Sequence, residues 1–155
     1  MVMKLGKLEQ ITDLRSIWKH EANDFTPWLA KEENLAALSD AIGIELVLEE
    51  QESNVGDFSV DLFATEEGTG RKVVIENQLE ETNHDHLGKI ITYASGKDAE
   101  VIIWIVRKAR DEHKKAIEWL NQHTDDSSAF FLIEIEVWKI GNSDPAPKFN
   151  IVERP

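Results

Sequence analysis

Two short stretches of the chain place acidic and amide side chains inside segments that otherwise have the pattern of β-strands. One is VDLFA, in which Asp61 follows Val60, and the other is VVIENQLE, which contains Glu76 and Gln78. Because burying a carboxylate costs free energy unless it is paired or bound to a metal, these residues indicate either a solvated strand face or a site.

Alternation along the strands predicts that these side chains meet. Successive side chains of a strand point to opposite faces, so Glu76 and Gln78 share one face. A hairpin that turns at Gly68-Thr69 would place Asp61 opposite Glu76 and Ser59 opposite Gln78. Opposed residues have Cβ atoms about 4.5–5.5 Å apart, and like charges at that distance destabilise a sheet unless a cation lies between them.

Oxygen ligands in small number predict a particular kind of metal site. Mg²⁺ or Mn²⁺ prefers carboxylate and amide oxygens, with water in the remaining positions. Such an ion polarises a phosphate and lowers the pKa of a bound water. The alternative is that Asp61 and Glu76 lie on a wet strand face, because 30 acidic residues among 155 place some acidic pair opposite by chance.

Capping and turn signals predict the elements that hold these residues. Thr26-Pro27 has the pattern of a helix start and Gly43 that of a helix end. An uninterrupted apolar run at 101–106 is typical of a strand covered on both faces. The predicted helices lie near residues 12–18, 26–43, 84–95 and from 111 onward, and the predicted strands at 44–50, 58–64, 73–80, 101–106 and 130–140. This order predicts an α/β fold with a mixed central sheet flanked by helices.

Length and composition set the domain and the compartment. We predict one domain over residues 1–141, followed by an extended tail over 142–155 as a candidate linker to further sequence. The chain has no Cys, which excludes disulfide and thiolate chemistry. It has neither a long apolar run nor a secretory pattern, so we expect a cytoplasmic protein without membrane contact. The net charge of −13 argues against a broadly basic surface and suits either solubility or cation binding.

The element order, with VDLFA on the second core strand and VVIENQ on the third, resembles the PD-(D/E)XK nuclease superfamily over roughly residues 26–106. The resemblance implies a restriction-endonuclease-like αβββαβ core, here with an added N-terminal helix and a C-terminal helix and strand. Asp61 matches the first acid of the motif and Glu76 the second. The implied activity is metal-dependent hydrolysis of nucleic acid, with DNA the expected substrate.

Gln78 departs from the family pattern, because it occupies the position of the motif's lysine. An amide orients a water but cannot take up a proton at neutral pH. Some active restriction enzymes of the superfamily resemble this chain in using Glu-x-Gln. On the next helix, Lys89 and Tyr93 match the Gln-x-x-x-Tyr positions of the exonuclease-like branch. Lys89 is therefore expected to supply positive charge, unless it is only a surface lysine beside a core tyrosine.

Four further residues are candidate accessory groups. Asp57 is a turn residue or an outer ligand, and Ser59 shares the face of Asp61. Glu33 loosely matches a helical Glu that assists the metal in parts of the superfamily. His86 shares a helix side with Lys89 and is a candidate phosphate contact. A zinc site at His84 and His86 is disfavoured, because residues two apart on a helix face different directions.

Three readings of function stay open at this point. The first is a Mg²⁺-dependent nuclease, for which a homodimer is an attractive arrangement on a two-stranded substrate. The second is a catalytically inactive module of the same fold, used for nucleic-acid binding or assembly within a larger defence or repair protein. The third is an unrelated α/β protein whose acidic strand face is solvated.

Overall fold

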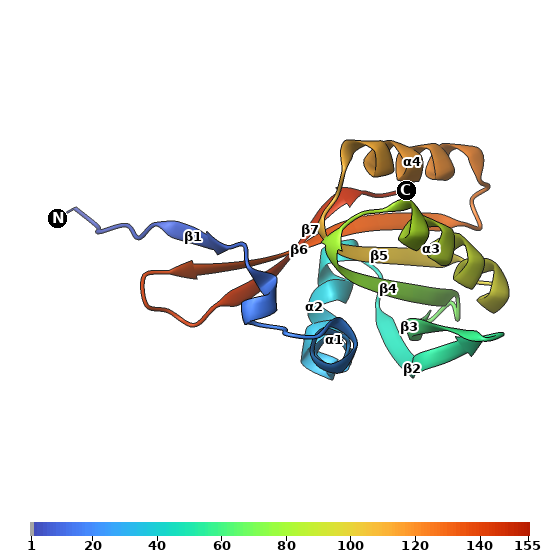
Figure 1. Ribbon diagram of the computed structural model, residues 1–155, viewed down its shortest axis with the longest axis horizontal. Coiled ribbons are helices and arrows are strands. Elements are labelled where there is room, and N and C mark those ends of the chain that lie inside the picture. Colours follow the sequence, from blue (N-terminus) through green and yellow to red (C-terminus); the bar gives the residue numbers. More distant parts are fainter. Residues whose placement is uncertain (1) are drawn as a thin grey trace.

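The computed structural model describes residues 2–155, which form a seven-stranded mixed sheet with helices on both faces (Figure 1). The helices are α1 (Thr26–Ala30), α2 (Glu32–Ile42), α3 (His84–Lys97) and α4 (Asp111–His123), with a 3₁₀ turn η1 (Leu14–Ser16) and a π-helical turn η2 (Glu21–Phe25) before them. The strands are β1 (Leu8–Ile11), β2 (Leu46–Val55), β3 (Phe58–Glu66), β4 (Lys72–Glu81), β5 (Val101–Lys108), β6 (Ala129–Ile140) and β7 (Ala146–Glu153). No helix within this range is long and apolar enough to cross a membrane.

The sheet has the strand order β1-β6-β5-β4-β3-β2, and β7 pairs with β6. The central strands β4, β5 and β6 are parallel, whereas β2, β3 and β4 form an antiparallel meander. Helices α3 and α4 make the two parallel crossovers, as parallel pairing requires. The order confirms the predicted αβββαβ core with a mixed sheet, the arrangement of a restriction-endonuclease-like fold.

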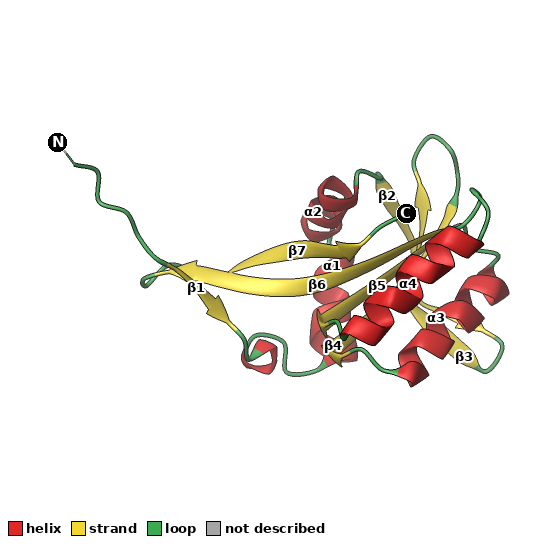
Figure 2. Ribbon diagram, turned by 90° about the horizontal axis from the view of Figure 1, so that it is seen from above, coloured by secondary structure: helices red, strands yellow, loops and turns green. Residues whose placement is uncertain are grey.

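Two apolar layers cover the two faces of the sheet. Helices α1 and α2 lie on one face and α3 and α4 on the other (Figure 2). In β4, Val73, Ile75 and Leu79 pack in the first layer and Val74 in the second, which confirms the predicted alternation of VVIENQLE. Asn77 lies in the first layer, where its Nδ2 donates to Thr26 Oγ1 at 3.0 Å.

The β2–β3 hairpin bends where Asp61 lies, and this bend changes the face of the residues beyond it. Leu62 packs with the first layer, but Val60 packs with the second, whereas regular alternation along a strand predicts one face for both. The cause lies on β2, where Glu52 has φ 57° and drops out of the register opposite Asp61. The hairpin end thereby turns toward α3.

Gly96 of α3 lets the hairpin end come close. A Cβ atom at this position would overlap Val55 Cγ1. Helix α3 continues to Lys97 instead of ending at residue 95 as predicted, and the left-handed residue that follows it is Asp98. The absence of a side chain, rather than backbone freedom, explains this glycine.

Three other segments differ from the sequence prediction. The N-terminal helix is reduced to η1, with no side-chain cap from Asp13. The helix predicted over 26–43 is broken at Lys31, where ψ is 142°. The tail over 142–155 is not a free linker, because β7 pairs with β6 over most of its length and Phe149 and Ile151 pack against the first layer.

Strands β6 and β7 extend beyond the helices as an arm, which also carries β1 and the N-terminal segment (Figure 1). On one edge of β6, β5 pairs as far as Glu134 and β1 begins to pair at Val137. Ile135 and Glu136 have no strand partner on that edge among residues 2–155. The arm therefore leaves a gap in the sheet next to the end of β5.

Candidate functional site

The central feature of the site is a separation of β3 from β4. Their pairing runs from Thr65–Lys72 to Leu62–Ile75 and stops there, one residue before Asp61 and Glu76. The Asn77 backbone N–H then donates to Asp61 Oδ2 at 2.7 Å instead of to a strand carbonyl. The bend in the hairpin thus points the Asp61 carboxylate toward β4 at the position where backbone pairing between β3 and β4 has stopped.

Glu76 is a buried carboxyl group with unused hydrogen-bonding capacity. It is only 7% exposed, and its Oε2 has no hydrogen-bond partner among residues 2–155. Burial, reinforced by the negative charge of Asp61, raises the pKa of Glu76 to about 9. A buried polar atom without a partner is uncommon in folded proteins and indicates either a bound group or a retained proton.

Asp61 shares this environment. Burial raises the pKa of Asp61 to about 7, the Asn77 N–H opposes that rise, and the charges of Glu21 and Glu52 add to it. Two neighbouring carboxylates in a desolvated place cannot both ionise cheaply. A retained proton or a bound cation would remove this conflict.

Glu21 is a third carboxylate near the pair, and the sequence analysis did not identify it. Its Oε1 accepts from the Leu79 N–H at 2.6 Å, at the end of β4. Burial raises its pKa, and its charge in turn raises the pKa of Asp61 and Glu76. It comes from η2, a segment without apolar periodicity, so no sequence signal marked it.

Lys89 and Tyr93 lie on the side of α3 that faces the carboxylates. The positive charge of Lys89 lowers the pKa of both Asp61 and Glu76. Burial, then the charge of Glu76, raises the pKa of Tyr93. Lys89 Nζ pairs with Asp85 at 3.4 Å on the exposed flank of the helix. Both residues are thus within electrostatic range of the pair, and the role expected of Lys89 stays a prediction.

Gln78 is fully buried, and both ends of its amide are engaged. Its Oε1 accepts from Trp104 Nε1 at 3.2 Å, and its Nε2 donates to the Glu81 carbonyl oxygen at 2.7 Å. A direct contact between Gln78 and an attacking water stays a prediction, because the side chain is fully buried and each end of its amide already has one partner within the chain. In the arrangement described, Gln78 fixes the end of β4.

A histidine pair that the sequence analysis did not single out lies beside this end of β4. His113 is 2% exposed, with Nδ1 2.7 Å from Thr82 Oγ1 and Nε2 3.0 Å from His84 Nδ1. Its ring packs edge-on against Trp104. Its position four residues before Ile117 on the inner side of α4 was the available signal. The pair joins the starts of α3 and α4.

The other predicted accessory residues are not brought to the carboxylates. Asp57 is exposed at the hairpin turn, and Glu33 is exposed in the first turn of α2. His86 Nδ1 lies 3.1 Å from Asn83 Oδ1, at the cap of α3. Ser59 is half-buried on β3, two residues before Asp61 in the chain.

The residues present fit a hard divalent cation with few protein ligands. Within residues 2–155, no group of three or more His, Cys, Asp or Glu side chains is close enough to hold a metal ion. Mg²⁺ is commonly bound by one or two carboxylates plus water and substrate phosphate. Asp61 and the partnerless Oε2 of Glu76 supply that number, and a cation would remove the charge conflict between them.

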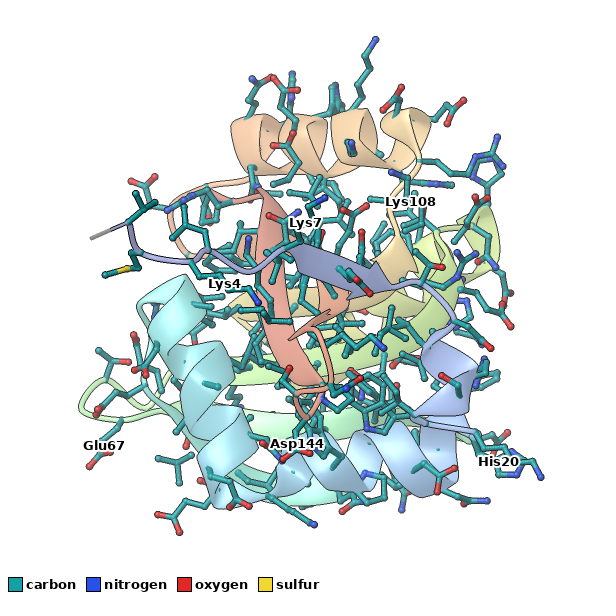
Figure 3. All side chains as sticks on the ribbon, turned by 90° about the vertical axis from the view of Figure 1, so that its left-hand side faces the viewer. Lys4, Lys7, His20, Glu67, Lys108 and Asp144 are labelled. Atoms are coloured by element: carbon teal, nitrogen blue, oxygen red, sulfur yellow. The ribbon has the colours of Figure 1, made fainter. Side chains whose placement is uncertain are left out.

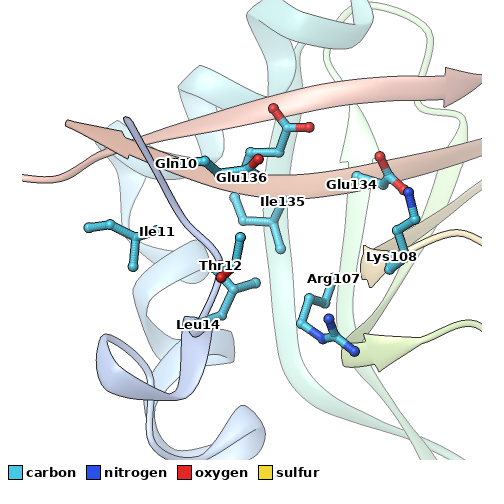
Figure 4. Close-up of a pocket in the computed structure, with 9 residues that line it drawn as sticks. All are labelled: Gln10, Ile11, Thr12, Leu14, Arg107, Lys108, Glu134, Ile135 and Glu136. Carbon is cyan, nitrogen blue, oxygen red and sulfur yellow. The ribbon is translucent and has the colours of Figure 1, made fainter. Parts of the chain in front are cut away.

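A separate pocket of about 270 Å³ lies in the sheet gap between β5 and β1 (Figure 4). Arg107 and Lys108 line it together with Glu134 and Glu136. Glu134 accepts from the Ala109 N–H at 2.8 Å, and Glu136 from Trp138 Nε1 at 3.0 Å. Both carboxylates are thus engaged, whereas neither cation is in an ion pair within residues 2–155.

The pocket between β5 and β1 lies at the carboxyl end of β5. Lys108 pairs in register with Glu81, at the ends of β5 and β4. Figure 3 shows Lys108 on the opposite side of the molecule from Glu67, which lies in the turn between β3 and β4. In α/β sheets, ligands commonly bind outside the carboxyl ends of parallel strands, which is where Arg107 and Lys108 lie, whereas Glu76 lies in the middle of β4.

Comparison with known proteins gives a limited result. No protein-family model and no curated protein matches the sequence. A similar solved structure is the crystal structure of a repair endonuclease from Pyrococcus abyssi, with a TM-score of 0.45 and 16% sequence identity. The alignment covers 59% of this chain and 45% of that chain, so the chain spans less than half of that protein's length.

Proposed function

We propose that the protein is a metal-dependent nuclease that hydrolyses phosphodiester bonds of nucleic acid, with DNA the expected substrate. The observation that carries the proposal is the pair Asp61 and Glu76 at the split between β3 and β4, with the partnerless Oε2 of Glu76. Mg²⁺ or Mn²⁺ bound there would polarise the phosphate and lower the pKa of a bound water.

The chain's own residues position and balance this chemistry. Asp61 is held by the Asn77 N–H, and Glu21 by the Leu79 N–H, so both carboxylates are fixed to β4. Lys89 brings positive charge to the side of α3, where it would offset the charge of a scissile phosphate. Gln78 acts as a positioning residue, because it joins β4 to Trp104 of β5 and to the backbone of Glu81 at the end of β4.

A cleavage assay with variants tests the proposal. Asp61→Asn and Glu76→Gln are each expected to lower Mg²⁺-dependent nicking of plasmid or single-stranded DNA by roughly 100-fold or more. Glu67→Gln is the matched control, since it removes an exposed carboxylate at the opposite end of the same hairpin. Calorimetric titration with Mn²⁺ should show binding to the wild-type protein and to Glu67→Gln, but weaker binding to Glu76→Gln.

The second candidate function is an inactive module that binds nucleic acid through the same surface. Two features of Gln78 favour it. The residue stands where the motif has a lysine, and its amide already has hydrogen-bond partners within the chain. Metal binding without cleavage of plasmid, linear or single-stranded substrates would support this reading over the first. The structure contains one chain, so the expected homodimer stays a prediction.

A further inference from the structure

Phe58 is a large aromatic side chain that the fold holds in the open. It is 62% exposed, at the start of β3 and directly after the turn at Gly56 and Asp57. The hairpin end that carries it is fixed, because Val55 packs closely on Gly96 of α3. Phe58 belongs to neither apolar layer, so most of its ring is available to a ligand.

A pocket of about 340 Å³ separates Phe58 from α3. Its size is at the lower end of small-ligand pockets, which run from roughly 300 to 1,000 Å³. The Phe58 ring faces Tyr93, with centroids 6.5 Å apart and planes at 39°. On the helix side, a Cβ at Gly88 would meet nothing within 4 Å. The residues that line the pocket are Phe58, His84, Asp85, Gly88, Lys89, Thr92 and Tyr93.

The pocket adjoins the carboxylate pair through two residues that belong to both. Lys89 and Tyr93 line it, and each interacts electrostatically with Asp61 and Glu76. Lys89 is held at the rim by Asp85, whose carboxylate is 3.4 Å from its Nζ. A ligand in the pocket would therefore place its neighbouring atoms beside Lys89 and the carboxylates.

Aromatic stacking surfaces bind nucleobases, and they do so without regard to sequence. In a duplex the faces of each base are covered by its neighbours, so a ring of this kind reaches only an unpaired or extruded base. The net charge of −13 also disfavours a broad grip on duplex phosphates. Stacking supplies affinity that does not depend on positive charge.

We propose that the Phe58 pocket binds a base of single-stranded nucleic acid, with the adjoining phosphate directed toward Lys89 and the carboxylate pair. This inference rests on the proposed function for its substrate class and adds the requirement for an unpaired base. Phe58 is then a residue that determines specificity, and Gly88 keeps the pocket open for the base.

Binding measured in the absence of cleavage tests this inference separately from catalysis. The full chain carrying Glu76→Gln serves as the parent, and fluorescence anisotropy with labelled oligonucleotides is the readout. The parent should bind single strands better than duplexes of the same length. Phe58→Ala should weaken single-strand binding roughly 10- to 100-fold, and Phe58→Trp should preserve it. An oligonucleotide with a run of abasic positions should bind the parent as weakly as the intact strand binds Phe58→Ala.

A second variant removes the pocket without changing Phe58. Gly88→Leu adds a side chain in the open space and should give the same loss, while thermal unfolding shows that the fold is kept. The inference would be overturned if Phe58→Ala bound intact single strands as tightly as the parent. It would also be overturned if the substitution weakened binding of intact and abasic strands equally. A Phe58→Ala variant that sediments differently from the parent but binds the oligonucleotides equally well would overturn it too, since Phe58 would then contact a second copy of the chain.

The outcomes separate the two proposals. Base-dependent binding without any cleavage by the wild-type protein supports the stacking pocket and refutes the nuclease. Metal-dependent cleavage with Phe58→Ala as active and as tightly bound as wild type supports the nuclease and refutes the pocket.

Discussion

At the scale of single residues, Glu76 links the candidate chemistry to the stability of the protein. Its pKa rises from 4.5 to about 9 on folding because it is buried beside Asp61. Between those two values the folded state binds more protons than the unfolded chain, so stability is fully present below the lower value and falls as pH rises toward the upper one. The raised pKa values of Asp61 and Glu21 act in the same direction.

The variant Glu76→Gln should therefore be more stable than the wild-type protein in alkaline buffer without metal. An amide of the same shape carries no charge to bury, so we expect a gain of at least about 1 kcal/mol, or roughly 2–4 °C in Tm, near about pH 8.5. The gain should shrink toward about pH 5, where the wild-type carboxyl is largely protonated in the folded state. Scanning calorimetry at both pH values measures it. A variant less stable than wild type at both would contradict a buried charge conflict.

Added Mg²⁺ gives the converse result. It should raise the Tm of the wild-type protein at alkaline pH, because it binds the folded state alone. The rise should be absent in Glu76→Gln and retained in Glu67→Gln. An equal rise in all three proteins would place the cation elsewhere.

Gln78 and Trp104 form a buried pair whose worth can be measured. Gln78→Met leaves the indole N–H and the Glu81 carbonyl without their partner, which should cost about 1–3 kcal/mol. Trp104→Phe removes the indole donor, and the double variant should lose less than the sum of the two. Chemical denaturation of the four proteins should give a coupling near about 1 kcal/mol. A coupling of zero would mean that the amide is free to turn toward the carboxylates.

At the scale of elements, local patterns predicted what depends on local geometry. The alternation in VVIENQLE and the turn at Gly68 gave the faces of β4 and its register with β3, because both follow from the two-residue period of a strand. The face of Val60 did not follow, since it depends on the bend at Glu52. Glu21 could not be found either, because only the tertiary fold brings η2 to Leu79.

Strand β7 shows a different limit of sequence patterns. Its residues APKFNIVE begin with Pro147 and Lys148, which are typical of edge strands and linkers alike. Its apolar residues Phe149 and Ile151 become informative only once the first layer, against which they pack, is known. Sequence patterns thus predicted that Asp61 and Glu76 lie opposite each other, but not the contacts of β7 or of Glu21.

Two glycines of α3 make a matched test of the hairpin contact. Gly88→Ala meets nothing within 4 Å and should stabilise the protein by up to about 1 kcal/mol through helix propensity. Gly96→Ala gains the same propensity but overlaps Val55, so it should destabilise. Adding Val55→Ala to Gly96→Ala should recover part of the loss. If both glycine variants were equally stabilised in urea denaturation, the hairpin end would not be fixed on α3.

At the scale of the whole molecule, the proposed function requires an acidic protein to attract a polyanion. With a net charge of −13, long-range attraction is unfavourable, so binding must depend on a few local cations. Arg110 and Lys114 are partly neutralised by Glu112 and Asp111. Arg107 and Lys108 have no such partner within residues 2–155, and they line the pocket at the carboxyl end of β5, next to the carboxyl end of β4.

The chain provides its own control for the role of these two cations. Arg71 and Lys72 form a second Arg-Lys pair at the start of β4, although Arg71 is already paired with Glu66 at 2.8 Å. The double variant Arg107→Ala/Lys108→Ala should weaken binding of single-stranded DNA and reduce the slope of log K against log salt by up to about 1.4. Arg71→Ala/Lys72→Ala should leave the slope unchanged, because it removes the same charge from the far end of the sheet. Anisotropy titrations over a series of salt concentrations measure both slopes. Equal reductions of the slope in the two double variants would show that net charge alone, rather than the position of Arg107 and Lys108 at the carboxyl end of β5, governs the attraction.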